Sequence, residues 1–284
     1  MLKRLLLLAL LFTGGLHAQP NPGWTAPFPP HRIIGNVYYV GSRDLASFLI
    51  TTPQGHILIN SNLATSPLQI RKSVEQLGFR FSDIKILLVS HAHFDHCAGS
   101  ALVKRLTHAQ YMVMDADVPA VESGGRKDFQ FGNSPGMYYP VAKVDRVLHD
   151  GSEVRLGGMV LTAHLTAGHT KGCTTWTLQV PGHGRLYNVV IVGSPNVLSE
   201  YKLVNNRAYP RIAQDFEKQF QTLRSLPCDV FLGAHGSYYG MQAKYAKLKV
   251  GGPNPFIDPA GYRDYVASRQ QDFEEDLKRQ QSHP

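Results

Sequence analysis

The fold of this chain is decided by one short stretch, Ser90-His91-Ala92-His93-Phe94-Asp95-His96. It ends a nearly continuous apolar run, 84–90, of the kind found in strands that are buried on both faces. In an extended segment, side chains two residues apart project to the same side, so His91 and His93 are expected to bind one metal ion. The turn that follows should carry the last two side chains of the stretch toward a second ion. This density of potential ligands predicts a metal centre.

Two further histidines lie beside glycine just after predicted strands, in Ala167-Gly168-His169-Thr170 and Gly233-Ala234-His235-Gly236. Small neighbours leave room for ligands. Imidazole and carboxylate ligands suit zinc, and catalytic zinc sites keep one position open for water. Two such ions roughly 3.5–4 Å apart can hold both a water molecule and a substrate oxygen. We therefore expect a catalytic zinc centre rather than a purely structural one, which would prefer a closed, cysteine-rich shell.

Short β-rich runs, separated by turn signals, occur on both sides of the metal motif. They are 33–40, 46–51 and 56–60 before it, and 110–114, 146–148, 153–156, 159–164, 174–180, 186–192 and 230–232 after it. Helical spacing of apolar residues predicts helices at 67–77, 99–106, 215–225 and 262–279. We find no linker and no internal repeat, so residues 19–284 are expected to form a single domain with two sheets and helices outside them.

The N-terminus has the order of a secretory signal peptide: two positive charges, the apolar run Leu5 to Phe12, and small residues ending at Ala18. The run is too short to span a bilayer, so we expect no stable membrane anchor. The formal net charge is +8, but Lys and Arg are scattered and no nucleic-acid-binding motif is present. We expect an exported, periplasmic protein that does not bind nucleic acid.

The stretch 91–96, together with Gly168-His169-Thr170 and the late Gly-Ala-His235, resembles the HxHxDH signature of the metallo-β-lactamase fold superfamily. That resemblance implies an α+β fold, a four-layer αββα sandwich of two mixed sheets with helices on the outer faces and the metals at one edge. More narrowly, several stretches are similar to the third subclass of the metallo-β-lactamases, namely 90–100, 111–115, 147–151, 162–176 and 228–235.

The subclass resemblance implies two Zn²⁺ ions per chain, a β-lactam substrate, and the following ligands. The first zinc takes His91, His93 and His169, and the second takes Asp95, His96 and His235. A zinc-activated hydroxide would attack the lactam carbonyl, with Asp95 as a catalytic residue that orients it. Antibiotic resistance, including carbapenem hydrolysis, would follow, and we expect a monomer.

The resemblance also implies substrate contacts from Ser194 and Asn196, although both residues could instead cap a turn. The aromatic loop 122–139 and Trp24 could form an apolar roof over the ligand or a small satellite core.

Two features of the cysteines depart from the relatives. Cys228 matches a position that many relatives join to a cysteine near the C-terminus, but the matching segment here continues into Tyr262. Cys97 replaces a small alanine and could be a buried hydrophobe or an oxidation-sensitive thiol. With three cysteines in the chain, at least one thiol of an exported protein stays free or pairs between chains.

Two other functions remain open. An exported zinc hydrolase of the same fold acting on lactones would use the same hydroxide chemistry. A metal-binding protein without turnover would need a closed coordination shell, for which the sequence offers no additional ligand. A glyoxalase II or RNA-processing nuclease of this superfamily would add an acidic bridging ligand, and segment 186–193 contains no Asp.

Overall fold

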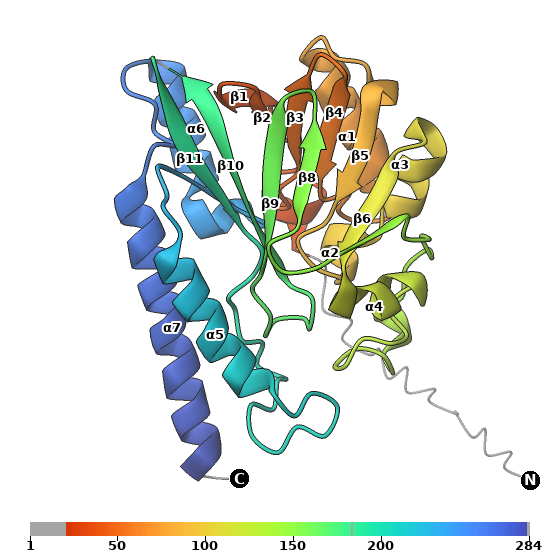
Figure 1. Cartoon of the computed structure of the whole chain (residues 1–284), viewed down its shortest axis with the longest axis vertical. Helices are drawn as coiled ribbons and strands as arrows, with labels where there is room; N and C mark the ends of the chain where they lie inside the picture. Colours follow the sequence, from red (N-terminus) through yellow and green to blue (C-terminus); the bar gives the residue numbers. More distant parts are fainter. Residues whose placement is uncertain (1–20, 183, 283–284) are drawn as a thin grey trace, which may run out of the picture.

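Two β-sheets lie face to face with helices outside them, in a computed structural model that describes residues 21–182 and 184–282 (Figure 1). The predicted signal peptide, 1–18, lies outside the described residues. The expected αββα sandwich of two mixed sheets is confirmed.

The first sheet has seven strands in the order β1-β2-β3-β4-β5-β6-β7. Strands β1 to β4 form an antiparallel meander, and β4 to β7 run parallel. Their bounds are β1 His31–Ile34, β2 Val37–Tyr39, β3 Phe48–Thr52, β4 Gly55–Ile59, β5 Ile84–Leu88, β6 Gln110–Met114 and β7 Arg146–Leu148. The apolar β5 lies in the interior of this sheet, as its composition predicted.

The second sheet has five strands in the order β12-β11-β10-β9-β8. Only the β11–β12 pair is parallel. The bounds are β8 Glu153–Leu156, β9 Met159–Leu165, β10 Thr174–Gly182, β11 Arg185–Val192 and β12 Val230–Gly233.

Alternation of side chains along the strands divides the interior into two clusters. On β4, Ile57 and Ile59 point into the cluster between the sheets, whereas Leu58 points into the cluster beneath the outer helices of the first sheet. Figure 1 shows α1 and α3 outside the first sheet and α5 and α7 outside the second. The helices are α1 Ser66–Gln76, α2 Phe94–Cys97, α3 Ser100–Thr107, α4 Val118–Glu122, α5 Ile212–Ser225, α6 Met241–Val250 and α7 Pro259–Ser282.

Several predicted bounds needed correction. The run 33–40 is two strands, because Gly35 adopts a positive φ and turns the chain between β1 and β2. Three helices were not predicted: α2 and α4 have only four and five residues, and α6 buries only its first residue, Met241. None of these three helices therefore has the amphipathic pattern by which a helix is recognised in a sequence.

The three cysteines, Cys97, Cys173 and Cys228, are all free. The first two are buried and the third is half-buried. Within residues 21–182 and 184–282, no helix combines the length and the apolar character needed to cross a membrane.

Candidate metal centre

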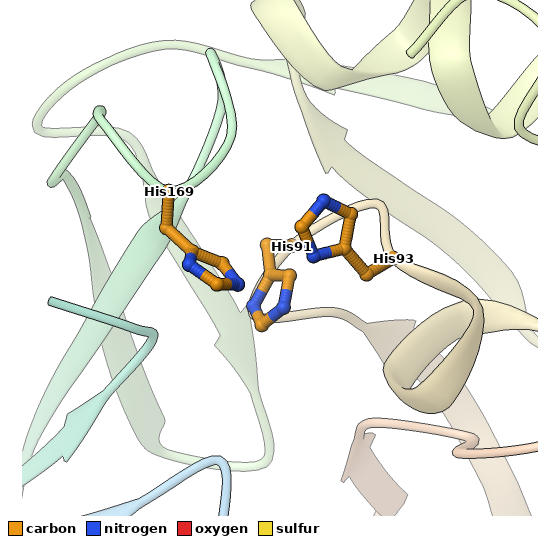
Figure 2. Close-up of side chains that lie close together, drawn as sticks. All are labelled: His91, His93 and His169. Carbon is orange, nitrogen blue, oxygen red and sulfur yellow. The ribbon is translucent and has the colours of Figure 1, made fainter. Parts of the chain in front are cut away.

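All six predicted ligands lie just beyond the carboxyl ends of three strands. The stretch 91–96 follows β5, His169 follows β9, and His235 follows β12. Since β5 belongs to one sheet and β9 and β12 to the other, the ligands come together where the edges of both sheets meet. Figure 2 shows the rings of His91 and His93 facing that of His169, which comes from a separate loop.

The first group contains His91, His93 and His169. One ring nitrogen of each lies within 4.8 Å of the others. The ring centroids of His91 and His93 are each 4.7 Å from that of His169. All three side chains are buried.

The second group contains Asp95, His96 and His235. The Nε2 atoms of His96 and His235 are 3.1 Å apart, and Asp95 Oδ2 lies 3.1 Å and 3.4 Å from them, respectively. The one-turn helix α2 produces this arrangement by turning Asp95 and His96 away from the extended segment that carries His91 and His93. His91 also lies close enough to Asp95 and His96 to share a potential metal site with them. The two groups are therefore adjacent.

The donor atoms fit zinc. In tetrahedral coordination with Zn–N distances of about 2.0–2.1 Å, donor atoms lie about 3.4 Å apart, which is close to the separations in the second group. Among the residues that the structure describes, the buried Nε2 of His93 and Nδ1 of His96 find no hydrogen-bond partner. Two converging groups of His and Asp donors are present, one of His91, His93 and His169 and one of His91, Asp95 and His96.

Burial and charge act differently on the two groups. Burial and the neighbouring His93 lower the pKa of His169 to about 3, and burial lowers the pKa of His93 to about 4. Burial also lowers the pKa of His235, but hydrogen bonds to Asp44 and Asp95 outweigh it and raise the pKa to about 9. Burial alone would raise the pKa of Asp95, yet His96 and His235 hold it well below its usual value.

Groups outside the ligand set fix the orientation of the outer histidines. His235 Nδ1 lies 3.0 Å from Asp44 Oδ2, and His169 Nδ1 lies 2.8 Å from the carbonyl oxygen of Asn196. Such partners fix both the tautomer and the ring plane of a ligand.

The loop that carries His169 is held at two further points. Gly168 has φ +138°, and a Cβ there would meet the ring of Phe216 at 2.7 Å, so only glycine fits. The hydroxyl of Tyr201 donates to the carbonyl oxygen of His169 at 2.6 Å. Gln280 on α7 donates to the carbonyl oxygen of Tyr201 and accepts from Leu203 N.

A cavity of about 580 Å³ opens over the two groups. Its apolar lining includes Trp24, Phe94, Phe131, Met137, Val197 and Leu198. Trp24, Phe131 and Met137 thus belong to the predicted roof. Phe129 instead packs on Tyr201 and Tyr209, and Tyr139 is buried in the cluster beneath the outer helices of the first sheet.

The two predicted substrate contacts lie differently. Asn196 lines the cavity, and its amide donates to the hydroxyl of Tyr238 at 2.7 Å. Ser194 is 0% exposed, and its hydroxyl lies 3.2 Å from the same Tyr238 oxygen. Tyr238 therefore lies between Ser194 and the cavity that it helps to line.

Sequence reasoning missed Asp44 and Tyr238. Asp44 is separated from His235 by 191 positions, and Tyr238 from Asn196 by 42. No local pattern indicates such pairs. A single aspartate or tyrosine near a turn carries no signal of its own.

The profile of the Metallo-beta-lactamase superfamily matches residues 43–184. The native FEZ-1 metallo-beta-lactamase from Legionella gormanii is 53% identical, with a TM-score of 0.89 over 90% of this chain and 98% of that one. The class B3 di-zinc metallo-beta-lactamase LRA-12 from an Alaskan soil metagenome is 35% identical, with a TM-score of 0.86 over 90% and 97% of the two chains.

A curated relative matches over a shorter segment. A probable metallo-hydrolase of Burkholderia pseudomallei is 29% identical over 110 residues, which are 39% of this chain and 35% of that protein. Since similarity to the solved structures extends over nine-tenths of the chain, the protein belongs to the metallo-beta-lactamase superfamily, in its class B3.

Proposed function

We propose that the protein is a zinc-dependent β-lactamase, which hydrolyses the cyclic amide of β-lactam antibiotics with two Zn²⁺ ions per chain. One observation carries this proposal: six His and Asp side chains converge as two adjacent groups beneath a cavity, in a chain whose sequence is 53% identical to that of a known metallo-beta-lactamase. The first group would hold one ion through His91, His93 and His169. The second would hold the other through Asp95, His96 and His235.

Zinc bound in these groups lowers the pKa of water to about 7 and acts as a Lewis acid toward a carbonyl oxygen. The residues supply position and charge. Asp95 stays ionised, so it can accept a hydrogen bond from the attacking water while it contributes to the second group. The reaction adds one water across the C–N bond of the lactam, and the released nitrogen takes up a proton.

The cavity lining suits a substrate with an apolar side chain. Trp24 and Phe131 offer aromatic surface to that side chain. No Lys or Arg lines the cavity among the residues that the structure describes. The carboxylate of a β-lactam would therefore rely on the second metal group and on the polar Asn196, with Ser194 acting from behind Tyr238.

We also propose that residues 1–18 direct export to the periplasm and that residues 19–284 are the mature single domain. The mature protein would act there as a monomer on a diffusible substrate.

The test is hydrolysis of a chromogenic cephalosporin and a carbapenem by the purified mature protein, with and without a zinc chelator. Turnover that the chelator abolishes and added zinc restores is expected. His91→Ala should abolish this turnover. His149→Ala is the matched control, because His149 is exposed and pairs with Asp115 rather than with a predicted ligand. An acyl-homoserine lactone serves as the competing substrate. Lactone turnover without lactam turnover would overturn the β-lactamase assignment.

A further inference from the structure

We propose that Asp117 is a positioning residue that fixes the distance between the two loops carrying the first group of zinc ligands. The inference rests on the proposed zinc centre and adds to it a residue whose carboxylate bonds to neighbours of the ligands, Ala92, Thr170 and Gly172.

The Asp117 carboxylate lies at the end of the short η3 helix, Asp115–Asp117, which follows β6. It is 2% exposed and accepts three hydrogen bonds. One oxygen accepts from Ala92 N at 2.9 Å and from the Thr170 hydroxyl at 2.8 Å, and the other accepts from Gly172 N at 2.8 Å.

These partners lie inside the ligand loops. Ala92 is the residue between His91 and His93, and Thr170 directly follows His169. One carboxylate therefore joins both loops of the first group. A backbone hydrogen bond from Thr174 N to Ser90 O, at 2.7 Å, also joins the two segments. It lies outside the loops, because Ser90 precedes His91 and Thr174 follows His169. Tyr139 and Tyr201 each hold one of the loops, through the carbonyl oxygens of Ala92 and His169, whereas Asp117 hydrogen-bonds to both.

The fit between Asp117 and Gly172 is close. A Cβ on Gly172 would lie 2.7 Å from both Cβ and Cγ of Asp117, and 2.5 Å from its backbone nitrogen. Only a glycine allows the carboxylate to reach the loop.

The hydrogen bonds also require an acceptor on both carboxylate oxygens. All three partners can donate, and an asparagine has only one acceptor oxygen. In Asp117→Asn the amide NH₂ would face a backbone N–H or the Thr170 hydroxyl, leaving at least one buried donor unpaired. The loops would then separate by a small amount, while the six ligands remain in the chain.

The primary test is a stepwise zinc titration of metal-free wild type and Asp117→Asn against a chromogenic chelator, with thermal unfolding of the same samples. Loss of a residue that orients ligands costs about 10–100-fold in metal affinity. We expect a loss of this size at the site of His91, His93 and His169, with the affinity of the second site unchanged. We also expect kcat of the variant to fall more than KM changes, and excess zinc to restore most of it.

The matched control is Asp229→Asn. Asp229 also ties backbone segments together, accepting from Asn188 N of β11 at 2.8 Å, but it directly precedes β12 and so lies at the opposite end of that strand from His235. This variant should lose stability without losing zinc affinity. Equal zinc affinity in Asp117→Asn and wild type would overturn the proposal, and so would an affinity loss in Asp229→Asn that matches it at equal loss of stability.

A second pair of variants applies if Asp117→Asn does not fold. Thr170→Val removes one of the three hydrogen bonds and keeps the shape of the side chain, whereas Thr170→Ser keeps the hydroxyl. Thr170→Ser should retain more zinc affinity than Thr170→Val, and the reverse order would contradict the proposal. A wild type that binds two zinc ions without lactam turnover would overturn the proposed function alone, because the affinity comparison would still decide the role of Asp117.

Discussion

The two metal groups differ in charge although they share one edge of the fold. The first consists of three histidines, and the pKa values of His93 and His169 are lowered to about 4 and 3. The second contains the ionised Asp95, and Asp44 behind it helps to raise the pKa of His235 to about 9. At neutral pH the first group is ready to coordinate a cation, whereas the second must release a proton from His235. The zinc affinity of the two adjacent sites should therefore depend differently on pH.

The largest effect is expected at Asp95, the ionised member of the second group. Asp95→Ala should reduce kcat/KM by about 10³-fold, because it removes both a ligand and the acceptor that orients the attacking water. The measurement is turnover at saturating zinc beside a zinc titration. The activity loss should exceed the loss expected from zinc occupancy. Full recovery of turnover on adding zinc would show that Asp95 is only a ligand.

Acidification should separate the two groups. Below pH 9 the metal-free His235 is protonated, so zinc must displace one proton from the second group, and affinity should fall about tenfold for each pH unit. Between pH 8 and pH 6 the loss should be about 100-fold. His93 and His169 are neutral throughout this range, so the first site should change little. Zinc titrations at several pH values measure both sites, and parallel curves would contradict the difference.

The same raised pKa has a consequence for the metal-free fold. A histidine that binds its proton more tightly when folded stabilises the fold fully below its ordinary pKa of 6.5. That contribution is lost as the pH rises through about 9. Thermal unfolding of chelator-treated protein across this window should show the decline.

A smaller effect is expected at Asp44, which orients His235 from behind. Asp44→Ala should weaken zinc binding to the second site by about 10–100-fold. It should also flatten the pH dependence of that site, since the carboxylate that raises the pKa of His235 is gone. Asp83→Ala is the control, because Asp83 also forms a charged pair, with Arg80 at 2.9 Å, but on the surface. A comparable zinc defect in both variants would contradict the specific role of Asp44.

The smallest effect is expected in the roof. Phe131 lines the cavity, and its ring centroid lies 5.4 Å from that of His93. Phe131→Ala should raise KM about fivefold, which corresponds to about 1 kcal/mol of lost apolar contact. Zinc affinity should not change. Leu68→Ala, at an exposed position of α1, serves as the control in the same steady-state assay.

Most strands and the candidate ligands could be predicted from the sequence, because both carry local patterns. The apolar β5 and the dense stretch 91–96 can be recognised in the sequence without knowledge of the fold. The partners that orient the ligands are not. Asp44 and Asp117 contact segments that lie far away in the sequence, and folding alone brings them together. Ser194 shows a further limit: its position was found by resemblance, whereas its cover by Tyr238 depends on packing.

The last turn of α7 is connected to a metal ligand by a short series of bonds. Gln280 holds the loop at Tyr201 and Leu203, and the Tyr201 hydroxyl holds the carbonyl oxygen of His169. A protease that removes Gln280, or a fusion partner joined within that turn, would break these bonds. The loop that carries His169 would then lose part of its support. We therefore expect catalytic activity to fall when the final helix is shortened past Gln280.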